Sequence, residues 1–587
     1  MVTVNVQRAT CNVVTCNVVE KRWEFAPREP ALESRLARGL RVSPVTAQLL
    51  VARGVRDLVA GGAFLRPALD SLHDPKGLDN MPAAVARAEA ALRANERIGV
   101  FGDYDVDGIS ASAILHNFFR LLGRDIHVRI PHRVTDGYGL SIAAVDEFAA
   151  AGVRLMITVD CGTANRVEIA HARARGIDTI VLDHHEPPAQ LPDACAIVNT
   201  KLPGSTYPFR GLCSAGLAFK FAWALSGGLA QSMKHRADFH AFLLDAMGLV
   251  ALGTVADVSP LVGENRVLVR YGLDALRGCG NPGLRALVEK ARLEDRALDT
   301  EDISFRLAPR LNALGRLGTA RDAFELLTTT DGARIAQILE LLESSNRTRR
   351  DIEHRIFEEA RARVDSERVI VVSDPGWHVG VVGIVAARLV DEFGRPAFVL
   401  AQEGDLARGS GRSVEGFALH EALASCRELL VSGGGHARAA GLSLRVSELD
   451  RFRERINAVA AETMPDGPPR PVLRIDDEVP LAHMTRAVVR EAGMLAPYGE
   501  ANPPPLFVAS HVRVAGHPRL MGKKNAHLSF YASQDGGPAL RAVAFDAGHL
   551  YDAVAGAQTL SLAFTPQVNG WGGREEVELL VQDVKLV

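Results

Sequence analysis

The stretch from Arg97 to Leu122, which reads RIGVFGDYDVDGISASAILHNFFRLL, constrains this chain more than any other. Its apolar start, Ile98–Phe101, predicts a buried strand, and Ser110–Leu122 predicts a helix. Between them stand three aspartates at alternate positions, namely Asp103, Asp105 and Asp107. Carboxylates this close repel one another unless a cation or water compensates their charge. Because open α/β sheets build their sites where strands feed helices, we expect a divalent-metal site here.

The chain that follows alternates short apolar runs with helical segments. This alternation favours a parallel sheet that helices cover on both faces. The predicted strands are Ile98–Phe101, Ile126–Ile130, Leu155–Val159, Thr179–Leu182 and Ala196–Val198.

Polar side chains directly follow two of the later predicted strands, Asp160 after the third and the run Asp183–His185 after the fourth. Asp257 follows a helical stretch, Ala241–Leu252. Because the carboxyl ends of parallel strands share one edge of a sheet, we expect these groups beside the three aspartates. Any one of them alone would be read as a solvated loop residue. Their combination, carboxylates with one or two imidazoles, favours a manganese or magnesium centre over structural zinc.

A carboxylate at the middle of such a centre can bridge two ions about 3.5–4 Å apart, as in two-metal phosphoryl chemistry. Asp160 is the expected bridge, because we expect its strand to lie centrally in the sheet. In this chemistry one ion lowers the pKa of a bound water that attacks phosphorus, and the other stabilises the leaving oxygen. The expected cofactors are therefore two divalent ions, manganese or magnesium.

The rest of the chain divides into further units. Residues 1–30 are expected to form a poorly ordered leader, and residues 31–330 the metal domain with helices before it. Residues 331–365 predict a charged connecting helix, and residues 366–465 a second, smaller α/β unit. After the linker MPDGPPRP, residues 470–587 show short strand-like runs that suggest a small barrel.

Four motifs, GDYDVDGISAS, TVDCG, LDHH and GTVADV, resemble in this order the DHH phosphoesterase superfamily. Together with PRLNALGRLG, SGRS, GGGHARAAG and the terminal barrel, they most resemble the RecJ family of bacterial single-strand-specific 5′→3′ exonucleases, from about Leu40 to the C-terminus. The resemblance implies an α/β fold: a parallel-sheet DHH metal domain, a bridging helix, a smaller α/β DHH-associated domain and a C-terminal OB-type β-barrel.

The resemblance also implies roles for individual residues. The paired aspartates of the family's first motif match Asp105 and Asp107, and the bridging aspartate of its second motif matches Asp160. The first histidine of the DHH motif matches His184, and the acid of the fourth motif matches Asp257. Asp103 and His185 are implied to lie in the first or second coordination layer. The implied metal set is Asp103, Asp105, Asp107, Asp160, His184 and Asp257, and His185 joins the catalytic residues.

A second constellation lies in the smaller α/β unit, in ARGSGRS and GGGH. A glycine run exposes backbone N–H groups that can cradle a phosphate, and arginine offers it paired donors. On their own these residues fit a surface turn with solvated arginines equally well, and only the resemblance to the DHH-associated domain favours substrate binding. They are Arg408, Ser410, Arg412, Ser413, Gly433, Gly434, Gly435 and His436.

Other basic residues cluster where a DNA strand would need phosphate contacts. One group lies in the PRLNALGRLG segment and the connecting helix, and another accompanies aromatic residues in the barrel, where charge and stacking faces suit unpaired bases. The first group is Arg306, Arg310, Asn312 and Arg316 with Arg347, Arg349 and Arg350, and the second is Lys523 and Lys524.

The composition limits the class of protein. The 587 residues carry a net charge of −3, and the seven cysteines include no C-x-x-C pair. These features, with no apolar run near the roughly 18 residues of a membrane span, favour a cytoplasmic protein that crosses no membrane.

The predicted activity is release of mononucleotides from the 5′ end of single-stranded DNA by two-metal hydrolysis, in repair and recombination. The resemblance further implies single-stranded-DNA-binding protein and a RecQ-type helicase as partners. Two alternatives stay open: a DHH phosphodiesterase acting on short oligonucleotides or cyclic dinucleotides, and a non-catalytic scaffold of RecJ type.

Overall fold

The computed structural model describes residues 21–133, 136–137, 139–228, 237–570 and 575–586. Its first sheet has five parallel strands in the order β3-β2-β4-β5-β6, so β4 lies in the centre. The bounds are β2 (Arg97–Gly102), β3 (His127–Arg129), β4 (Val153–Val159), β5 (Asp178–Leu182) and β6 (Ala196–Val198). The five predicted strands are thus confirmed, each within two residues at either end.

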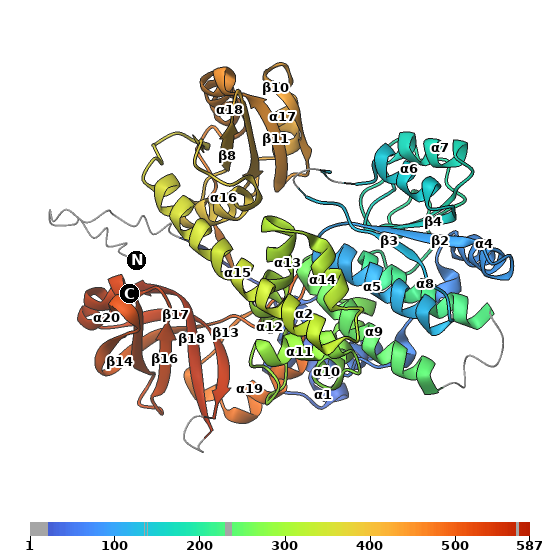
Figure 1. Ribbon diagram of the computed structural model, residues 1–587. Helices are drawn as coiled ribbons and strands as arrows, with labels where there is room; N and C mark the ends of the chain where they lie inside the picture. Colours follow the sequence, from blue (N-terminus) through green and yellow to red (C-terminus); the bar gives the residue numbers. More distant parts are fainter. Residues whose placement is uncertain (1–20, 134–135, 138, 229–236, 571–574, 587) are drawn as a thin grey trace.

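Both faces of this sheet are buried, because successive strand residues point to opposite sides. Val100 packs in one apolar cluster, and its neighbour Phe101 packs in another with Val145 and Phe148. The first face is covered by α4 (Met81–Arg93), α5 (Val106–Leu121), α8 (Ser214–Gly228) and α9 (Ala237–Ala256), and the second by α6 (Ile142–Ala150) and α7 (Arg166–Ala174) (Figure 1). The strands therefore end at an edge that lies between two helical layers.

Among the described residues, helix α9 is the one helix long and apolar enough to cross a membrane by length and composition. Its apolar window has a mean hydropathy of 1.7, and 56% of that window is buried inside the protein. It packs against α5, α8 and α10 (Gly263–Gly278). We therefore interpret α9 as a core helix of the metal domain, and its carboxyl end leads directly to Asp257.

A series of helices connects the metal domain to the second α/β unit. They are α11 (Pro282–Lys290), α12 (Thr300–Asp302), the π-helical turn η4 (Ile303–Leu307), α13 (Ala308–Leu317), α14 (Ala320–Leu326) and α15 (Gly332–Arg361). Helix α15 runs along the metal domain and reaches the second unit (Figure 1). The predicted connecting helix is therefore confirmed.

The second unit has a five-stranded sheet in the order β10-β11-β9-β8-β7. Its elements are β7 (Ile370–Asp374), α16 (Val379–Phe393), β8 (Ala397–Glu403), β9 (Leu406–Arg412), α17 (Leu419–Ala424), β10 (Leu430–Gly435), β11 (Ala439–Arg445) and α18 (Leu449–Thr463). The glycine run that we expected as a phosphate-cradling loop forms the edge strand β10, in which Gly434 pairs with Gly441. Because pairing commits alternate N–H groups to β11, only the outward ones face solvent.

The C-terminal part is a barrel, as predicted. Its strands are β14 (Phe507–Met521), β15 (His527–Ser533), β16 (Leu540–Ala544), β17 (Leu560–Asn569) and β18 (Glu576–Leu586), and pairing of β14 with β17 closes the ring. The short strand β13 (Asp477–Glu478) and the helices α19 (Arg486–Ala492) and α20 (Tyr551–Gly556) accompany it.

The described N-terminal segments pack with this barrel, which differs from our expectation. Strand β1 (Arg22–Phe25) pairs with β12 (Val472–Ile475), although residues 1–30 were expected to be poorly ordered; residues 1–20 lie outside the described part. Helices α1 (Pro30–Leu40), α2 (Pro44–Ala52) and α3 (Leu58–Leu65), which we expected with the metal domain, bury Leu36, Leu49 and Leu50 in the barrel's core. Their partners come from the far end of the chain, so no local pattern reveals them.

A buried arginine joins the barrel to the metal domain. Arg266 on α10 is only 2% exposed, and it donates hydrogen bonds to backbone carbonyls of Leu495 (2.6 Å), Ala496 (2.8 Å) and Phe64 (2.9 Å). Nearby, the N–H of Leu261 donates to the carbonyl of Glu500 at 2.8 Å. These bonds fix the segment before the barrel against the metal domain.

Candidate active site

The aspartate-rich motif forms the turn between β2 and α5. Asp105 is the N-cap of α5, and its Oδ1 accepts hydrogen bonds from the N–H groups of Asp107 (3.0 Å) and Gly108 (3.1 Å). A Cβ at Gly108 would lie 2.6 Å from the carbonyl oxygen of Asp103, so only glycine permits this close turn. The turn brings all three alternate aspartates to the sheet edge.

The Asp107 carboxylate sits at the start of another helix. Its Oδ2 accepts from the N–H of Ser214 at 2.7 Å, and its Oδ1 accepts from the N–H of Ala215 at 2.9 Å. These are the first residues of α8, where the helix dipole favours a negative charge. The Ser214 hydroxyl donates to Asp160 Oδ1 at 3.1 Å, so one residue of α8 holds two carboxylates in place.

Asp160 follows the central strand β4 in a left-handed backbone conformation, with φ at 63°. Aspartate and asparagine tolerate this conformation better than most residues. Its N–H donates to the carbonyl of Leu182 at 3.1 Å, which holds its backbone against the end of the neighbouring strand β5. The expected central place of Asp160 is therefore what the strand order shows.

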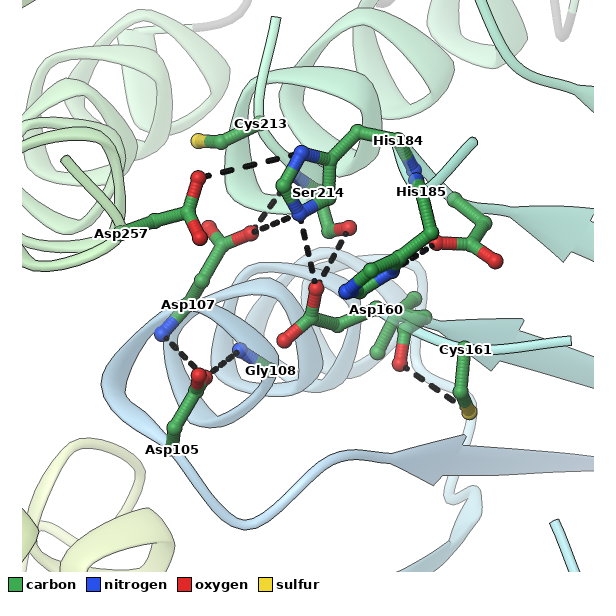
Figure 2. A network of polar contacts seen from close by, with 12 residues as sticks. Asp105, Asp107, Gly108, Asp160, Cys161, His184, His185, Cys213, Ser214 and Asp257 are labelled. Atoms are coloured by element: carbon green, nitrogen blue, oxygen red, sulfur yellow. Dashed lines mark hydrogen bonds and ion pairs between the residues drawn. The ribbon is translucent and has the colours of Figure 1, made fainter. Parts of the chain in front are cut away.

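The His184 imidazole lies between carboxylates that come from three different elements (Figure 2). Its Nε2 is 3.3 Å from Asp160 Oδ1 and 3.9 Å from Asp107 Oδ2, and its Nδ1 is 3.8 Å from Asp257 Oδ2. The hydroxyl of Ser259 donates to Asp257 at 2.7 Å.

Asp183 supports the two histidines. Its Oδ1 accepts from the N–H groups of His184 (2.8 Å) and His185 (3.1 Å) and from His185 Nδ1 (2.7 Å), and its Oδ2 accepts from the N–H of Thr163 (3.0 Å). Burial acts to raise the pKa of Asp183, but these hydrogen bonds and the His185 ring lower it overall. Asp183 therefore stays ionised and orients its neighbours.

The described structure places all seven predicted groups in one cluster, which we call the acidic cluster: Asp103, Asp105, Asp107, Asp160, His184, His185 and Asp257. Three sets within it bring their ligand atoms within 4.8 Å of one another: Asp103, Asp105 and Asp160; Asp107, His184 and Asp257; and Asp160, His184 and His185.

The residues of the acidic cluster fit a divalent cation. Burial first, and Asp257 next, raise the pKa of Asp107 to about 6, and burial and Asp105 raise the pKa of Asp160. Buried Asp103 Oδ1 and His184 Nε2 have no hydrogen-bond partner among the described residues. Repelling carboxylates with unsatisfied acceptor atoms are what a bound cation would compensate.

Beside the acidic cluster lies an arginine cluster, Arg133, Arg316, Arg349 and Arg412, which both α/β units supply. Arg316 Nη1 donates to the carbonyl of Gly380 at 2.9 Å, which joins α13 to α16. Burial, followed by the charges of Arg133, Arg349 and Arg412, lowers the pKa of Arg316 to about 9. Arg133 lies 4.8 Å from the centre of the Tyr104 ring, and its charge acts on Asp103. Arg349 is paired with Glu353 at 2.8 Å, and the positive charge that remains where these four guanidiniums meet suits an anionic ligand.

Sequence reasoning missed several of these groups. Arg133 lies in the segment that follows strand β3, so the position of polar groups after parallel strands also indicates it. Tyr104 lies inside the aspartate motif itself. Nothing local signals Ser214, because its role depends on the packing of α8 against α5.

Other predicted residues lie elsewhere. Ser413 is buried and its hydroxyl donates to the carbonyl of Phe417 at 2.6 Å, so it stabilises a turn. Arg310 Nε donates to Glu343 at 2.6 Å and braces α13 against α15. Arg408 is exposed at the far end of β9, where its partner is Glu403. His436 continues the exposed edge strand, Arg306 is exposed on η4, and Lys523 and Lys524 lie exposed between β14 and β15.

Three family descriptions match this chain: "DHH family, N-terminal domain" over residues 97–254, "DHHA1 domain" over residues 366–462 and "RecJ OB domain" over residues 475–583. The metal domain, the second α/β unit and the barrel thus each have a counterpart in a described family.

Named relatives cover nearly the whole chain. The single-stranded-DNA-specific exonuclease RecJ of Bacillus subtilis is 34% identical over 96% of this chain and 70% of its own length. The protein of the same name from Dickeya dadantii is 35% identical over 94% of this chain and 98% of its own length.

The crystal structure of RecJ from Thermus thermophilus in complex with Mn2+ matches 96% of this chain and 80% of that chain, with a TM-score of 0.83 and 32% identity. A second structure of that protein, in complex with Mg2+, matches with a TM-score of 0.77. On the similarity of sequence and fold along nearly its entire length, this chain belongs to the RecJ family of single-stranded-DNA-specific exonucleases.

Proposed function

We propose that this protein is a metal-dependent exonuclease that removes mononucleotides from the 5′ end of single-stranded DNA, in DNA repair and recombination. One juxtaposition carries the proposal. The acidic cluster at the sheet edge lies directly beside the arginine cluster, with Arg133 acting on Asp103. A phosphodiester needs both: cations at the bond that breaks, and guanidiniums on the flanking phosphates.

Two divalent ions, manganese or magnesium, are the proposed cofactors, and oxygen-rich ligand sets with a histidine suit both. We assign Asp103, Asp105 and Asp160 to one ion and Asp107, His184 and Asp257 to the other, with Asp160 shared. Asp160 lies in the first of these sets, and its Oδ1 is 3.3 Å from Nε2 of His184, a member of the second, which supports this assignment. When bound, such ions supply an activated water and stabilise the leaving oxygen.

The remaining residues hold the substrate. His185, oriented by Asp183, is proposed to act on the phosphate beside the ions. Arg316, Asn312 and Arg412 are proposed to bind phosphates next to the scissile bond, because they lie in or beside the arginine cluster. Exposed Lys523 and Lys524 of the barrel are proposed to bind the strand further along.

The cellular setting follows from the same proposal. We propose that the protein works in the cytoplasm and acts with a single-stranded-DNA-binding protein and a RecQ-type helicase, which would supply unpaired ends. The support for these partners is the family resemblance. Co-purification of the protein with each partner, tested with and without nuclease treatment, would separate direct contact from tethering through DNA.

Turnover of labelled DNA tests the function. With manganese, a 5′-labelled single strand should release labelled mononucleotide first, whereas a 3′-labelled strand should shorten progressively. A blunt duplex of the same sequence should resist. Release of the 3′ nucleotide first, or equal rates on the blunt duplex, would contradict the proposal. Asp160→Asn serves as the inactive control for contaminating nucleases.

A further inference from the structure

A cavity of about 240 Å3 lies beside the acidic cluster, between the end of α9 and helices α13, α15 and α16. Sites for drug-sized ligands occupy about 300–1,000 Å3, so this cavity suits one small unit of a polymer. Val255 and Ala256, next to Asp257, form one wall, and Asn312, Arg316 and Arg349 form another. A unit bound here would therefore lie next to the groups proposed to hold the ions.

Arg349 has a buried hydrogen-bond donor that is not used. The residue is 9% exposed; its Nη1 donates to Glu353 at 2.8 Å and its Nη2 to Asn346 at 3.3 Å. Its Nε has no hydrogen-bond partner among the described residues. Burial lowers the pKa of Arg349, because its charge is poorly solvated there. Arg349 lines the cavity, and a buried donor without a partner in such a residue is suited to an anionic oxygen that enters the cavity.

Phe305 has its side chain in solvent and directly follows Ser304, which lines this cavity. It is 70% exposed, in the π-helical turn η4 that directly precedes α13. Pro309 and Asn312, which follow on α13, also line the cavity. Val258, another lining residue, is 64% exposed. Two exposed apolar side chains are therefore available close to the cavity, and π-helical turns occur often at functional sites.

We propose that this cavity is a nucleotide subsite of the DNA path, in which Arg349 binds a backbone phosphate and Phe305 stacks on a base at the mouth. The inference rests on the proposed function and adds to it the residues that bind one nucleotide next to the scissile bond. Stacking on an aromatic ring tolerates every base, because every base has a π-face. The subsite would thus add affinity for unpaired bases without sequence preference.

An abasic scan tests the stacking half. Single-stranded oligonucleotides that lack one base, at each successive position from the 5′ end, are bound in EDTA, and Kd is measured by fluorescence anisotropy. For the wild type we expect one position at which loss of the base weakens binding roughly five- to a hundredfold, the range of base–aromatic stacking. Phe305→Ala should bind intact DNA more weakly and show no such position. Phe25→Ala, which removes another exposed ring, should behave as wild type.

The phosphate half is tested by the salt dependence of binding. Each phosphate contact on a single strand contributes a slope of about −0.7 to log Kobs against log[salt]. Arg349→Gln should reduce the slope by about that amount, whereas Arg355→Gln, which changes an exposed arginine further along α15, should not. Arg349→Lys, which keeps the charge, should restore the slope and serves as a second variant if Arg349→Gln folds poorly.

The outcomes that overturn the inference are distinct from failure of the proposed function. A position-specific abasic penalty that persists in Phe305→Ala would refute stacking. An unchanged salt slope in Arg349→Gln, with a lowered melting temperature, would mean that Arg349 stabilises α15 and does not bind a phosphate. Both measurements concern binding without divalent ions, so they are read independently of turnover. Absence of turnover in the wild type with manganese would refute the proposed function alone.

Discussion

Asp183 Oδ1 accepts a 2.7 Å hydrogen bond from Nδ1 of His185, so the first residue of the DHH motif orients the third. The same oxygen also accepts from the backbone N–H groups of both histidines. The motif is therefore a single hydrogen-bonded turn at the end of β5, in which one carboxylate determines the positions of two imidazoles.

The first prediction concerns this turn. Asp183→Asn removes the charge and replaces one of the two carboxylate oxygens by an NH2 group. Either the Thr163 N–H or the groups of the two histidines then lose their hydrogen-bond acceptor. Second-layer partners of metal ligands commonly contribute 10–100-fold, and we expect kcat/KM on single-stranded DNA to fall by about that factor. Glu186→Gln, at the exposed neighbouring residue, is the matched control. Activity within twofold of wild type would mean that the turn keeps its conformation without the Asp183 carboxylate.

The second prediction separates stability from activity at Asp160. Asparagine tolerates the φ of 63° and keeps the hydrogen bond from Ser214, but it removes one of several repelling carboxylates. Asp160→Asn should therefore melt at a higher temperature than wild type in EDTA, because burial and Asp105 disfavour the charged form. Its turnover with manganese should fall by more than a hundredfold, since loss of a shared ligand exceeds a second-layer effect.

Scanning calorimetry with and without manganese checks this. The ion should raise the melting temperature of wild type more than that of Asp160→Asn. Equal gains would show that Asp160 does not contact the ions. Asp160→Ala is the less informative change, because alanine in the left-handed region adds roughly 1–2 kcal/mol of strain.

The site could be located from sequence because its groups obey a positional rule. Asp160 and the Asp183–His185 run each follow an apolar strand of a parallel sheet, and such strands end at one edge. The strand conformation of the glycine run 433–435 could not be predicted from the sequence in this way. Glycine permits a loop or a strand, and pairing with β11 decided between them.

Long-range packing accounts for what sequence could not predict. The sequence of α1–α3 indicates helices, but the barrel residues that these helices pack against lie at the other end of the chain. Ser413 matches a phosphate-binding motif in its residue type, yet its hydroxyl is committed to the carbonyl of Phe417. Arg349 was a candidate phosphate contact from the sequence, but the cavity that it lines forms only where α9, α13, α15 and α16 pack together.

The third prediction concerns the joint between barrel and metal domain. Arg266→Met leaves the carbonyls of Leu495 and Ala496 without their buried donor. Several such groups lose partners at once, and we expect a loss on the order of 3 kcal/mol in the free energy of unfolding. The thermal transition should split, with the barrel and α1–α3 melting separately from the metal domain. Arg270→Met, which removes an exposed arginine one turn later on α10, should leave a single transition near the wild-type temperature.

The fourth prediction tests the barrel's role in DNA binding. Truncation after Pro471 would expose Leu36 and Leu49, which pack in the barrel's core, so loss of binding by a truncated chain would be ambiguous. The double change Lys523→Gln and Lys524→Gln removes two exposed charges without touching a core. The salt slope for long single strands should fall by up to about 1.4, while turnover of very short oligonucleotides persists.

A control keeps the net charge equal for this comparison. Lys21→Gln with Lys76→Gln removes two lysines outside the β14–β15 connection. If both double variants lower the slope equally, the effect comes from overall charge and the barrel has another role.

The fifth prediction concerns the 5′ end itself. An enzyme that starts at a 5′ end needs a binding site that fixes the terminal phosphate, so that the next phosphodiester bond lies beside the ions. Arg412 is suited to bind that phosphate. Its Nη1 donates to Ser410 Oγ at 2.7 Å and to the carbonyl of Gly411 at 2.8 Å, and these bonds hold the guanidinium in place beside Arg133. Arg412→Ala should therefore reduce the preference for 5′-phosphorylated over 5′-hydroxyl ends.

The expected size follows from one charged hydrogen bond, about 1.5–3 kcal/mol, which corresponds to roughly ten- to a hundredfold in kcat/KM on phosphorylated ends. Arg408→Ala is the matched control, because Arg408 lies on the same strand but at its far end, about 13 Å away at roughly 3.3 Å per residue. Manganese binding, followed by calorimetry, should be unchanged in both variants. If Arg412→Ala weakens manganese binding and keeps the end preference, Arg412 supports the acidic cluster instead, and the terminal phosphate is held by another member of the arginine cluster.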